Sequence, residues 1–237
     1  MTVLVLIGIS IAYVYYGNIN KAEDPRVVEA KYQYKAYNLF VAKNDYQSVF
    51  ATLDTIKNIY LQFTDYQNSY ELGVVYNNES AIWLTSALLK ISDEQNSLAE
   101  LDSAKKYAKK SILIYESWLN EFRNLSEKDV LIRVNDYYKN PHKTFENKDI
   151  SKIIAKRTDD IIVAQKETIK RLSVAYTNLG IIQRHNSDYE RAMESYKKAL
   201  ALWEGNRSAK NNINILLGRP VEEASVIEKL FPEDKNK

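Results

Sequence analysis

The sequence predicts an all-α protein, and three observations support this. The 237-residue chain contains only 6 Gly and 4 Pro, whereas sheet proteins with many tight turns use more of both. Apolar residues recur with helical period through most of the chain after Asp24, most clearly over residues 161–182. No stretch shows the sustained alternation of apolar and polar residues that predicts a strand.

The composition excludes several classes of protein. The chain has 33 Lys and Arg against 31 Asp and Glu, so its formal charge of +2 leaves no excess to neutralise nucleic-acid phosphates. It has no Cys, which excludes disulfides, thiolate metal sites and cysteine nucleophiles. His142 and His185 are the only imidazoles, too few for a His-rich metal centre. We therefore expect no nucleic-acid partner, no metal and no cofactor.

The N-terminal run predicts attachment to a membrane. Residues 1–20 contain no charged side chain, and nineteen helical residues span about 28 Å, close to the thickness of the hydrocarbon core. Tyr13, Tyr15 and Tyr16 lie near the end of the run, and tyrosine favours the headgroup level. We expect residues 1–20 to form a single transmembrane anchor. A cleaved signal peptide, for which a basic n-region and an A-x-A-like site are missing, and a buried first helix of the domain are the alternatives.

Two opposing arguments concern the side of the membrane on which the helical domain lies. Lys21, Arg26, Lys31 and Lys35 come after the apolar run, which would favour a cytoplasmic body. A very short N-terminal tail commonly stays inside the cell as an uncleaved signal, which favours an extracytoplasmic body. We expect the second arrangement.

The remaining chain divides at a few marked positions. Asp24-Pro25 predicts a helix start, with Asp as N-cap and Pro in the first turn. Residues 126–150 are the most irregular part, and their Tyr-Tyr-Lys-Asn-Pro run is typical of a loop or a broken helix. Residues 233–237 are a charged tail expected to be disordered. The predicted divisions are the anchor at 1–20, a helical domain over 21–232 and this tail.

A repeat pattern is clearest over residues 176–203. A large aromatic residue and Leu-Gly are followed, after an Asn-Ser-Asp-Tyr turn, by small and aromatic residues at regular offsets: Tyr176, Leu179, Gly180, Ala192, Tyr196, Ala199 and Trp203. This pattern resembles the tetratricopeptide repeat family, in which small residues let two helices cross closely and aromatic residues fill the space between them. Two positions depart from the family, because Gln183 stands where Tyr is usual and Glu204 where Pro is usual.

Three other segments share parts of this pattern. The offsets 0, 4, 7 and 11 recur in two of them, at Val49, Leu53, Ile56 and Tyr60, and at Ala104, Ala108, Ser111 and Tyr115. A last unit runs from Asn211 through a Gly218-Arg219-Pro220 turn to a helix expected from Val221 to Phe231. The resemblance therefore implies a tetratricopeptide-like solenoid of helical hairpins, and the long spacing between units implies that some helices exceed the minimal repeat.

The resemblance also implies a non-enzymatic scaffold that binds a protein or peptide partner. Repeat solenoids bind on their concave face, which the first helix of each hairpin lines. Transferred onto this chain, the inward positions are Lys35, Asn38, Thr177, Ile181, Arg184, Asn211, Asn212 and Ile215. Plain solvent exposure is the alternative for each polar residue, and only fragments of the family's Lys and Asn carboxylate-binding pattern are present.

Tyrosines and lysines add two further hypotheses. Of the 18 Tyr, six lie at helix-packing offsets and are expected in the core: Tyr46, Tyr60, Tyr115, Tyr176, Tyr189 and Tyr196. Tyr137 and Tyr138 lie in the irregular segment and are candidates for a loop interaction. A basic stripe at Lys105, Lys106, Lys109 and Lys110 indicates an ordinary exposed helix face more readily than a site for anionic lipid or an acidic partner.

No catalytic constellation is predicted. Asp159 and Asp160 are neighbours and point about 100° apart on a helix, and no phosphate-binding or metal-binding motif is present. We expect a membrane-tethered interaction scaffold in an envelope-associated complex. Its abundance of Asn, Lys, Ile and Tyr favours a bacterial source. The alternatives are a ligand-binding accessory subunit of a membrane transporter, and an enzyme whose site is assembled from distant residues.

Overall fold

A computed structural model describes residues 22–89, 94–139, 142–146 and 148–222. Every regular element in this part of the chain is a helix: α2 (Val28–Ala42), α3 (Tyr46–Leu61), α4 (Tyr70–Leu89), α5 (Glu94–Phe122), α6 (Glu127–Tyr137), η1 (Lys143–Phe145), α7 (Ile150–His185), α8 (Tyr189–Leu202) and α9 (Arg207–Leu216). The all-α prediction is confirmed for the described residues. None of their helices is long and apolar enough to span a bilayer. The anchor predicted at residues 1–20 and the tail at 233–237 lie outside them.

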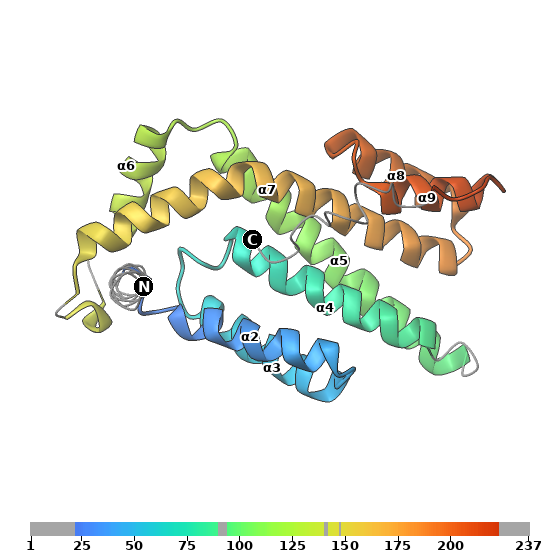
Figure 1. Cartoon of the computed structure of the whole chain (residues 1–237), viewed down its shortest axis with the longest axis horizontal. Helices are drawn as coiled ribbons and strands as arrows, with labels where there is room; N and C mark the ends of the chain where they lie inside the picture. Colours follow the sequence, from blue (N-terminus) through green and yellow to red (C-terminus); the bar gives the residue numbers. More distant parts are fainter. Residues whose placement is uncertain (1–21, 90–93, 140–141, 147, 223–237) are drawn as a thin grey trace, which may run out of the picture.

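The helices form consecutive hairpins stacked side by side (Figure 1). α2 pairs with α3, α4 with α5, and α7 with α8, while α9 packs on α8 and α7. Neighbouring hairpins meet through α3 and α4 and through α5 and α7, and α6 is an insertion that packs on α7. The arrangement is consistent with the predicted tetratricopeptide-like fold. α5 and α7 have 29 and 36 residues, so the expectation that some helices exceed the minimal repeat is confirmed.

Two hairpins cross through the same pair of residue types. An ideal Cβ on Gly180 of α7 would lie 2.4 Å from Cε1 of Tyr196 on α8, and one on Gly73 of α4 would lie 2.4 Å from Cε1 of Tyr115 on α5. Tyr196 and Tyr115 are 0% and 1% exposed. Glycine is therefore required at both crossings, because any side chain there would occupy the space of the tyrosine ring.

This geometry corrects the alignment of the segment from Ala104 to Tyr115 with the repeat at residues 176–203. The offsets predicted that Tyr115 is equivalent to Trp203, whereas its contact with Gly73 makes it equivalent to Tyr196. Ser111 then occupies the place of Ala192, and its hydroxyl donates to the carbonyl of Gly73 at 2.9 Å. A local signal for the partner helix was present in the sequence, because Leu72-Gly73-x2-Tyr76 matches the family's first helix.

The turns of the first and third hairpins share one design. Asp45 and Asp188 cap α3 and α8, and each accepts the backbone N–H three residues ahead. Asn44 and Ser187, which precede them, both have positive φ values of 54° and 59°. Each Asp also donates its own N–H to a carbonyl five residues earlier, which satisfies the end of the preceding helix. The Asp45-Tyr46 and Asp188-Tyr189 turns are therefore structurally equivalent.

Other predicted boundaries differ from the structure. Residues 25–27 form a turn, and α2 begins only at Val28, although the Asp24 carboxylate accepts the backbone N–H of Arg26 at 2.9 Å as the predicted cap would. The irregular segment 126–150 is broken into α6 and η1, as expected. Val221 and Glu222 are not helical, so the start predicted for the last helix is wrong, and residues 223–231 lie outside the described residues.

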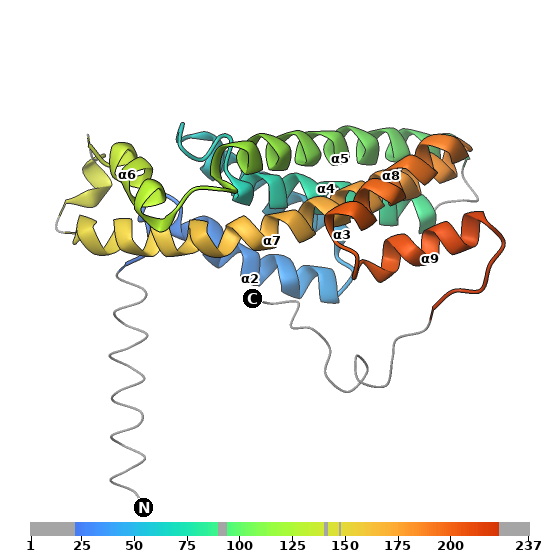
Figure 2. The ribbon, with the colours of Figure 1, turned by 90° about the horizontal axis from the view of Figure 1, so that it is seen from above.

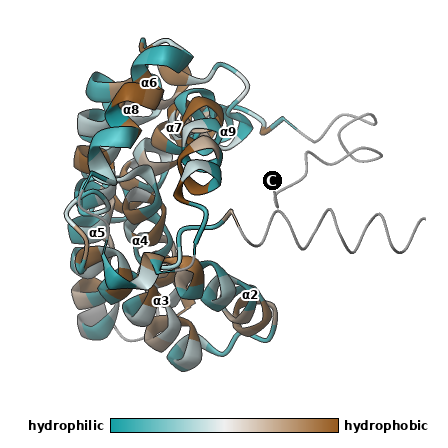
Figure 3. Cartoon of the chain, turned by 90° about the vertical axis from the view of Figure 1, so that its left-hand side faces the viewer, coloured by the Kyte–Doolittle hydropathy of each residue, from teal (hydrophilic) through white to brown (hydrophobic). Residues whose placement is uncertain are grey.

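Buried side chains fill the spaces between the stacked helices. Val49, Leu53 and Ile56 are 0% exposed, which confirms the predicted packing positions of α3. Some large apolar residues stay on the surface, among them Leu39 of α2, Leu113 of α5 and Val163 of α7, each more than 60% exposed. Figure 3 shows the hydrophobic colouring both between helices and at parts of the surface of α2 and α6.

Candidate functional site

First helices of the hairpins share one side of the stack. In Figures 2 and 3, α2 and α9 lie on the side opposite α5 and α8, with α4 and α7 between them. The amide of Asn178 on α7 donates to the side-chain oxygen of Asn77 on α4 at 3.2 Å, which joins two first helices directly. Val174 on α7 is 37% exposed, and Ile181 is half-buried.

A hollow of about 620 Å³ opens where α7 ends, α8 begins and α9 ends. Its walls are Arg184, His185, Tyr189, Met193, Ile215 and Leu216. Two residues predicted from separate repeat units, Arg184 and Ile215, therefore meet in one site. Tyr189 is 58% exposed and Ile215 48% exposed, so the apolar lining is open to solvent.

Charge in this hollow comes from Arg184. Burial, together with the neighbouring Arg184 guanidinium, lowers the pKa of His185 below its ordinary value. The neutral form of the imidazole is therefore favoured at pH 7, and the guanidinium of Arg184 supplies the positive charge beside the hollow. The hollow combines apolar walls with one fixed positive charge.

Sequence reasoning missed four residues of this hollow. Tyr189 was predicted in the core, and that prediction is wrong because the side chain lies on the outer surface at the start of α8. His185, Met193 and Leu216 carried no sequence signal, since their role depends on how α9 packs beside α7. Only the position of Tyr189 directly after the capping Asp188 could have suggested exposure, because the first turn of a helix is often open to solvent.

Two of the predicted groove residues are structural instead. Thr177 is 2% exposed and accepts a hydrogen bond from Nδ2 of Asn206, which caps α9. Asn212 is 8% exposed and accepts from the hydroxyl of Tyr196 at 3.3 Å. Both side chains hold α9 against the α7–α8 hairpin, so they are not available to a partner.

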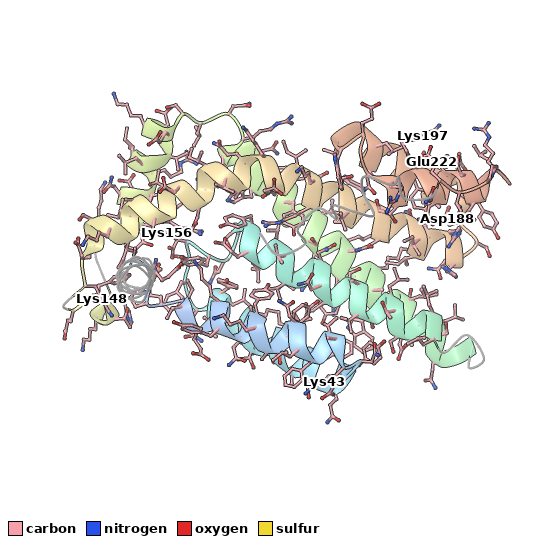
Figure 4. The ribbon with its side chains drawn as sticks, viewed as in Figure 1. Lys43, Lys148, Lys156, Asp188, Lys197 and Glu222 are labelled. Carbon is pink, nitrogen blue, oxygen red and sulfur yellow. The ribbon has the colours of Figure 1, made fainter. Side chains whose placement is uncertain are left out.

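The other predicted positions are accessible but do not meet in one place. Lys35 and Asn38 are exposed on α2, and the ammonium of Lys35 lies 5.4 Å from the ring centroid of Tyr32. The side chain of Asn211 on α9 binds both the N–H and the carbonyl of Glu222, at 2.7 and 3.0 Å. It therefore holds the chain after α9 against that helix, near where Figure 4 labels Glu222.

The tyrosine pair of the irregular segment has two different roles. Tyr138 is 5% exposed and donates from its hydroxyl to Asp24 at 2.8 Å, so its prediction as a loop contact is wrong. It belongs to a buried cluster in which Arg26 pairs with Asp24 and Asp65, each at 2.7 Å. Tyr137 is half-buried and lines a separate cavity.

That second cavity has a volume of about 320 Å³. It lies between the α3–α4 connection, the end of α5, α6 and α7, and its lining includes Asp65, Trp118, Glu121, Phe122, Tyr137 and Arg157. Arg157 forms an ion pair with Glu71 beneath it. Within the described part of the chain, no three His, Cys, Asp or Glu side chains gather where they could hold a metal ion.

Comparison with known proteins identifies one repeat. Residues 173–206 match the family model described as Tetratricopeptide repeat, and they span the second half of α7, α8 and the capping residue of α9. No curated protein and no solved structure shows a significant match to the chain. Tetratricopeptide repeats are typically non-catalytic modules of protein–protein interaction, and this part of the chain is similar to one.

Proposed function

We propose that the chain is a membrane-tethered protein–protein interaction scaffold within an envelope-associated complex. The observation that carries the partner-binding role is the open hollow at the junction of α7, α8 and α9, where Arg184 and Ile215 meet. The matched repeat at residues 173–206 supports it, because this class of repeat generally binds other proteins.

The lining of the hollow indicates what kind of segment it would receive. Tyr189, Met193 and Ile215 offer apolar surface, and covering such surface is favourable by about 25 cal/mol for each Å². Arg184 stands beside them as a fixed positive charge. A peptide with a large apolar side chain next to a carboxylate would satisfy both features.

Site-specific photocrosslinking tests this role. A photoreactive residue at Ile215 or Tyr189 of the full-length protein is expected to crosslink to a discrete partner protein in native membranes. The same residue at Leu113, which is 67% exposed on α5, is the matched control and is expected to give no such product. Crosslinking from Ile215 only to residues 223–237 of the same chain, or equal products from Leu113, would contradict the proposal.

Tethering requires its own test, because residues 1–20 lie outside the described part of the chain. Their uncharged length supports an anchor, and the short N-terminal tail of such an anchor favours a helical body on the extracytoplasmic side. The native protein should stay with the membrane after alkaline carbonate extraction, while a variant that begins at Ala22 should be released. Protease added to cells whose outer envelope has been removed, but whose inner membrane is intact, should digest the helical domain.

The ligand-binding alternative rests on the 320 Å³ cavity. Its aromatic walls and its charged side chains are features of small-molecule sites. Native mass spectrometry of the freshly purified protein tests this function. A bound small molecule that is lost from a Tyr137→Ala variant, but kept by an Ile215→Ala variant, would favour a transporter accessory over a scaffold.

A further inference from the structure

Four lysines of α5 form an exposed surface that the hollow does not include. Lys105 with Lys109, and Lys106 with Lys110, stand one helical turn apart, and all but the half-buried Lys105 are exposed. Among the described residues, no ion pair joins any of these four ammonium groups to a carboxylate. We call these four residues the α5 lysine surface.

Aromatic rings of two helices support this surface. Tyr76 of α4 and Tyr107 of α5 stack with their centroids 6.1 Å apart. The ammonium of Lys110 lies 5.1 Å from the centroid of Tyr76, and that of Lys106 lies 5.7 Å from the centroid of Tyr107. Cation–π contacts of this kind restrict the lysine side chains while leaving their charges exposed. Because these lysine side chains are already restricted, they lose less conformational entropy when they bind an anion.

Repulsion within the surface favours an acidic partner. Like charges at i and i+4 destabilise a helix, and this surface contains two such pairs, which only Asp102, four residues before Lys106, and the buried Glu79 near Lys110 offset in part. A partner that brings carboxylates spaced about 6 Å apart, the rise of four helical residues, would remove both repulsions at once.

The borders of the surface favour a narrow partner over a flat one. Asp102 is exposed one turn before the lysines, and Asp54 of α3, 61% exposed at its side chain, lies at the other border beside Lys57. An anionic bilayer pressed against α5 would also meet these carboxylates, whereas a single helix or extended segment can follow the lysines alone.

We propose that the α5 lysine surface binds an acidic segment of a second protein, with carboxylates repeated at i and i+4. Since α5 lies on the opposite side of the stack from α9 in Figures 2 and 3, this site is separate from the hollow. Both sites can be occupied together, so the scaffold would join two partners.

The experiment measures binding of a fluorescent helical peptide with Glu pairs at i and i+4 to the full-length protein in a non-ionic detergent. A Lys106→Gln/Lys110→Gln variant removes two charges of the surface. Lys197→Gln/Lys198→Gln removes two exposed charges of α8 and is the matched control; Figure 4 labels Lys197 on that helix. Circular dichroism checks that both variants are folded. A Lys105→Gln/Lys109→Gln variant repeats the test with the two lysines of the surface other than those placed over the tyrosine rings.

Peptide binding is expected to weaken on the order of 10-fold in both α5 variants and to change less than about twofold in the control. Equal weakening in the α8 control would overturn the proposal, because binding would then follow net charge alone. Stronger binding to phosphatidylserine vesicles or to single-stranded DNA of matched charge, with the same loss in the α5 variants, would also overturn the proposal. The absence of measurable peptide binding at low salt would overturn it as well. Loss of crosslinking at Ile215 would not affect this result, since that residue reports on the other site.

Discussion

Arg26 connects three segments that are far apart in the sequence. Its guanidinium pairs with Asp24 and Asp65 and lies between 5.1 and 5.6 Å from the ring centroids of four aromatic residues: Phe63, Tyr66, Tyr138 and Phe145. The segment before α2, the α3–α4 connection and the α6–η1 insertion therefore meet around one buried charge. Removal of that charge would leave two carboxylates buried without their partner.

An Arg26→Met variant is expected to lose about 3–5 kcal/mol of unfolding free energy, as when one member of a buried ion pair is removed. Urea denaturation followed by circular dichroism measures the loss. The control is Arg191→Met, which removes an ion pair whose arginine is 70% exposed at its side chain and should cost less than about 1 kcal/mol. Similar losses in both variants would mean that the buried cluster contributes little.

The same cluster predicts a dependence on pH. Burial by itself raises the pKa of Asp24, but the hydrogen bonds and charge of Arg26 outweigh it and hold the pKa below the usual aspartate range. Burial likewise raises the pKa of Glu71, but the charge and the hydrogen bond of Arg157 outweigh it, so the pKa of this carboxyl also lies below its ordinary value. Because both values are depressed in the folded state, their stabilisation is complete above about pH 5 and is lost as the pH falls below about 4.

Urea denaturation midpoints between pH 2 and pH 7 measure this effect. An Asp24→Asn variant should be less stable than the wild type at pH 7, and the difference should shrink toward pH 2, where the wild-type carboxylate is protonated. A difference that stayed constant over this range would show that Asp24 is not ionised in the folded protein.

At the scale of the helix, the close crossings of α4 with α5 and of α7 with α8 decide how the hairpins pack. Each depends on a glycine whose missing side chain is replaced by a tyrosine ring. The hydroxyl of Ser173 on α7 donates to the carbonyl of Ala199 on α8 at 2.7 Å and adds a second link to the matched repeat. Such crossings tolerate little extra volume because the interior is close-packed.

A Gly180→Ala substitution should therefore destabilise the protein by about 1–3 kcal/mol, the usual cost of overpacking, although alanine favours a helix more than glycine does. In a Tyr196→Leu background, where the ring is absent, the same substitution should cost far less. A double-mutant cycle of thermal denaturation measures this coupling. Additive effects of the two substitutions would show that the ring does not determine the requirement for glycine.

The elements differ in how readily the sequence predicts them. Asp45 and Asp188 are capping residues because a short carboxylate accepts the free N–H groups of the next turn, and this is a local property. At Asp24 the carboxylate accepts the backbone N–H of Arg26, which is a local contact, but it also binds two tyrosines from distant segments. The sequence near Asp24 contains no signal for these tertiary contacts, and the predicted start of α2 is three residues too early.

At the scale of the whole molecule, the hairpins contact mainly their neighbours in the stack. Stability in such a solenoid is close to a sum of terms for each repeat and each interface. The central helices α4 and α7 contact more neighbouring helices than α2 and α9, which lie at the ends of the described stack (Figure 1), and the long helix α5 packs against both α4 and α7.

Hydrogen–deuterium exchange should therefore be graded along the stack. We expect the slowest exchange in α4, α5 and α7, and faster exchange in α9 and in α2 beyond the Arg26 cluster. An Asn206→Ala variant, which removes the cap of α9 and two hydrogen bonds to α7, should speed exchange in α9 with little effect on α2. Uniform exchange across the described helices would instead indicate a single cooperative unit.

The sequence alone determined the helical class, the repeat at residues 173–206 and the turns at the two Asp-Tyr pairs. These depend on local periodicity, capping and the size of residues at fixed offsets. Only the tertiary structure decided that Tyr115 packs on Gly73, that Thr177 and Asn212 are buried, and that Arg184 and Ile215 share a hollow with Tyr189. These facts depend on how whole helices rotate and cross, and the offsets within one helix do not contain that information.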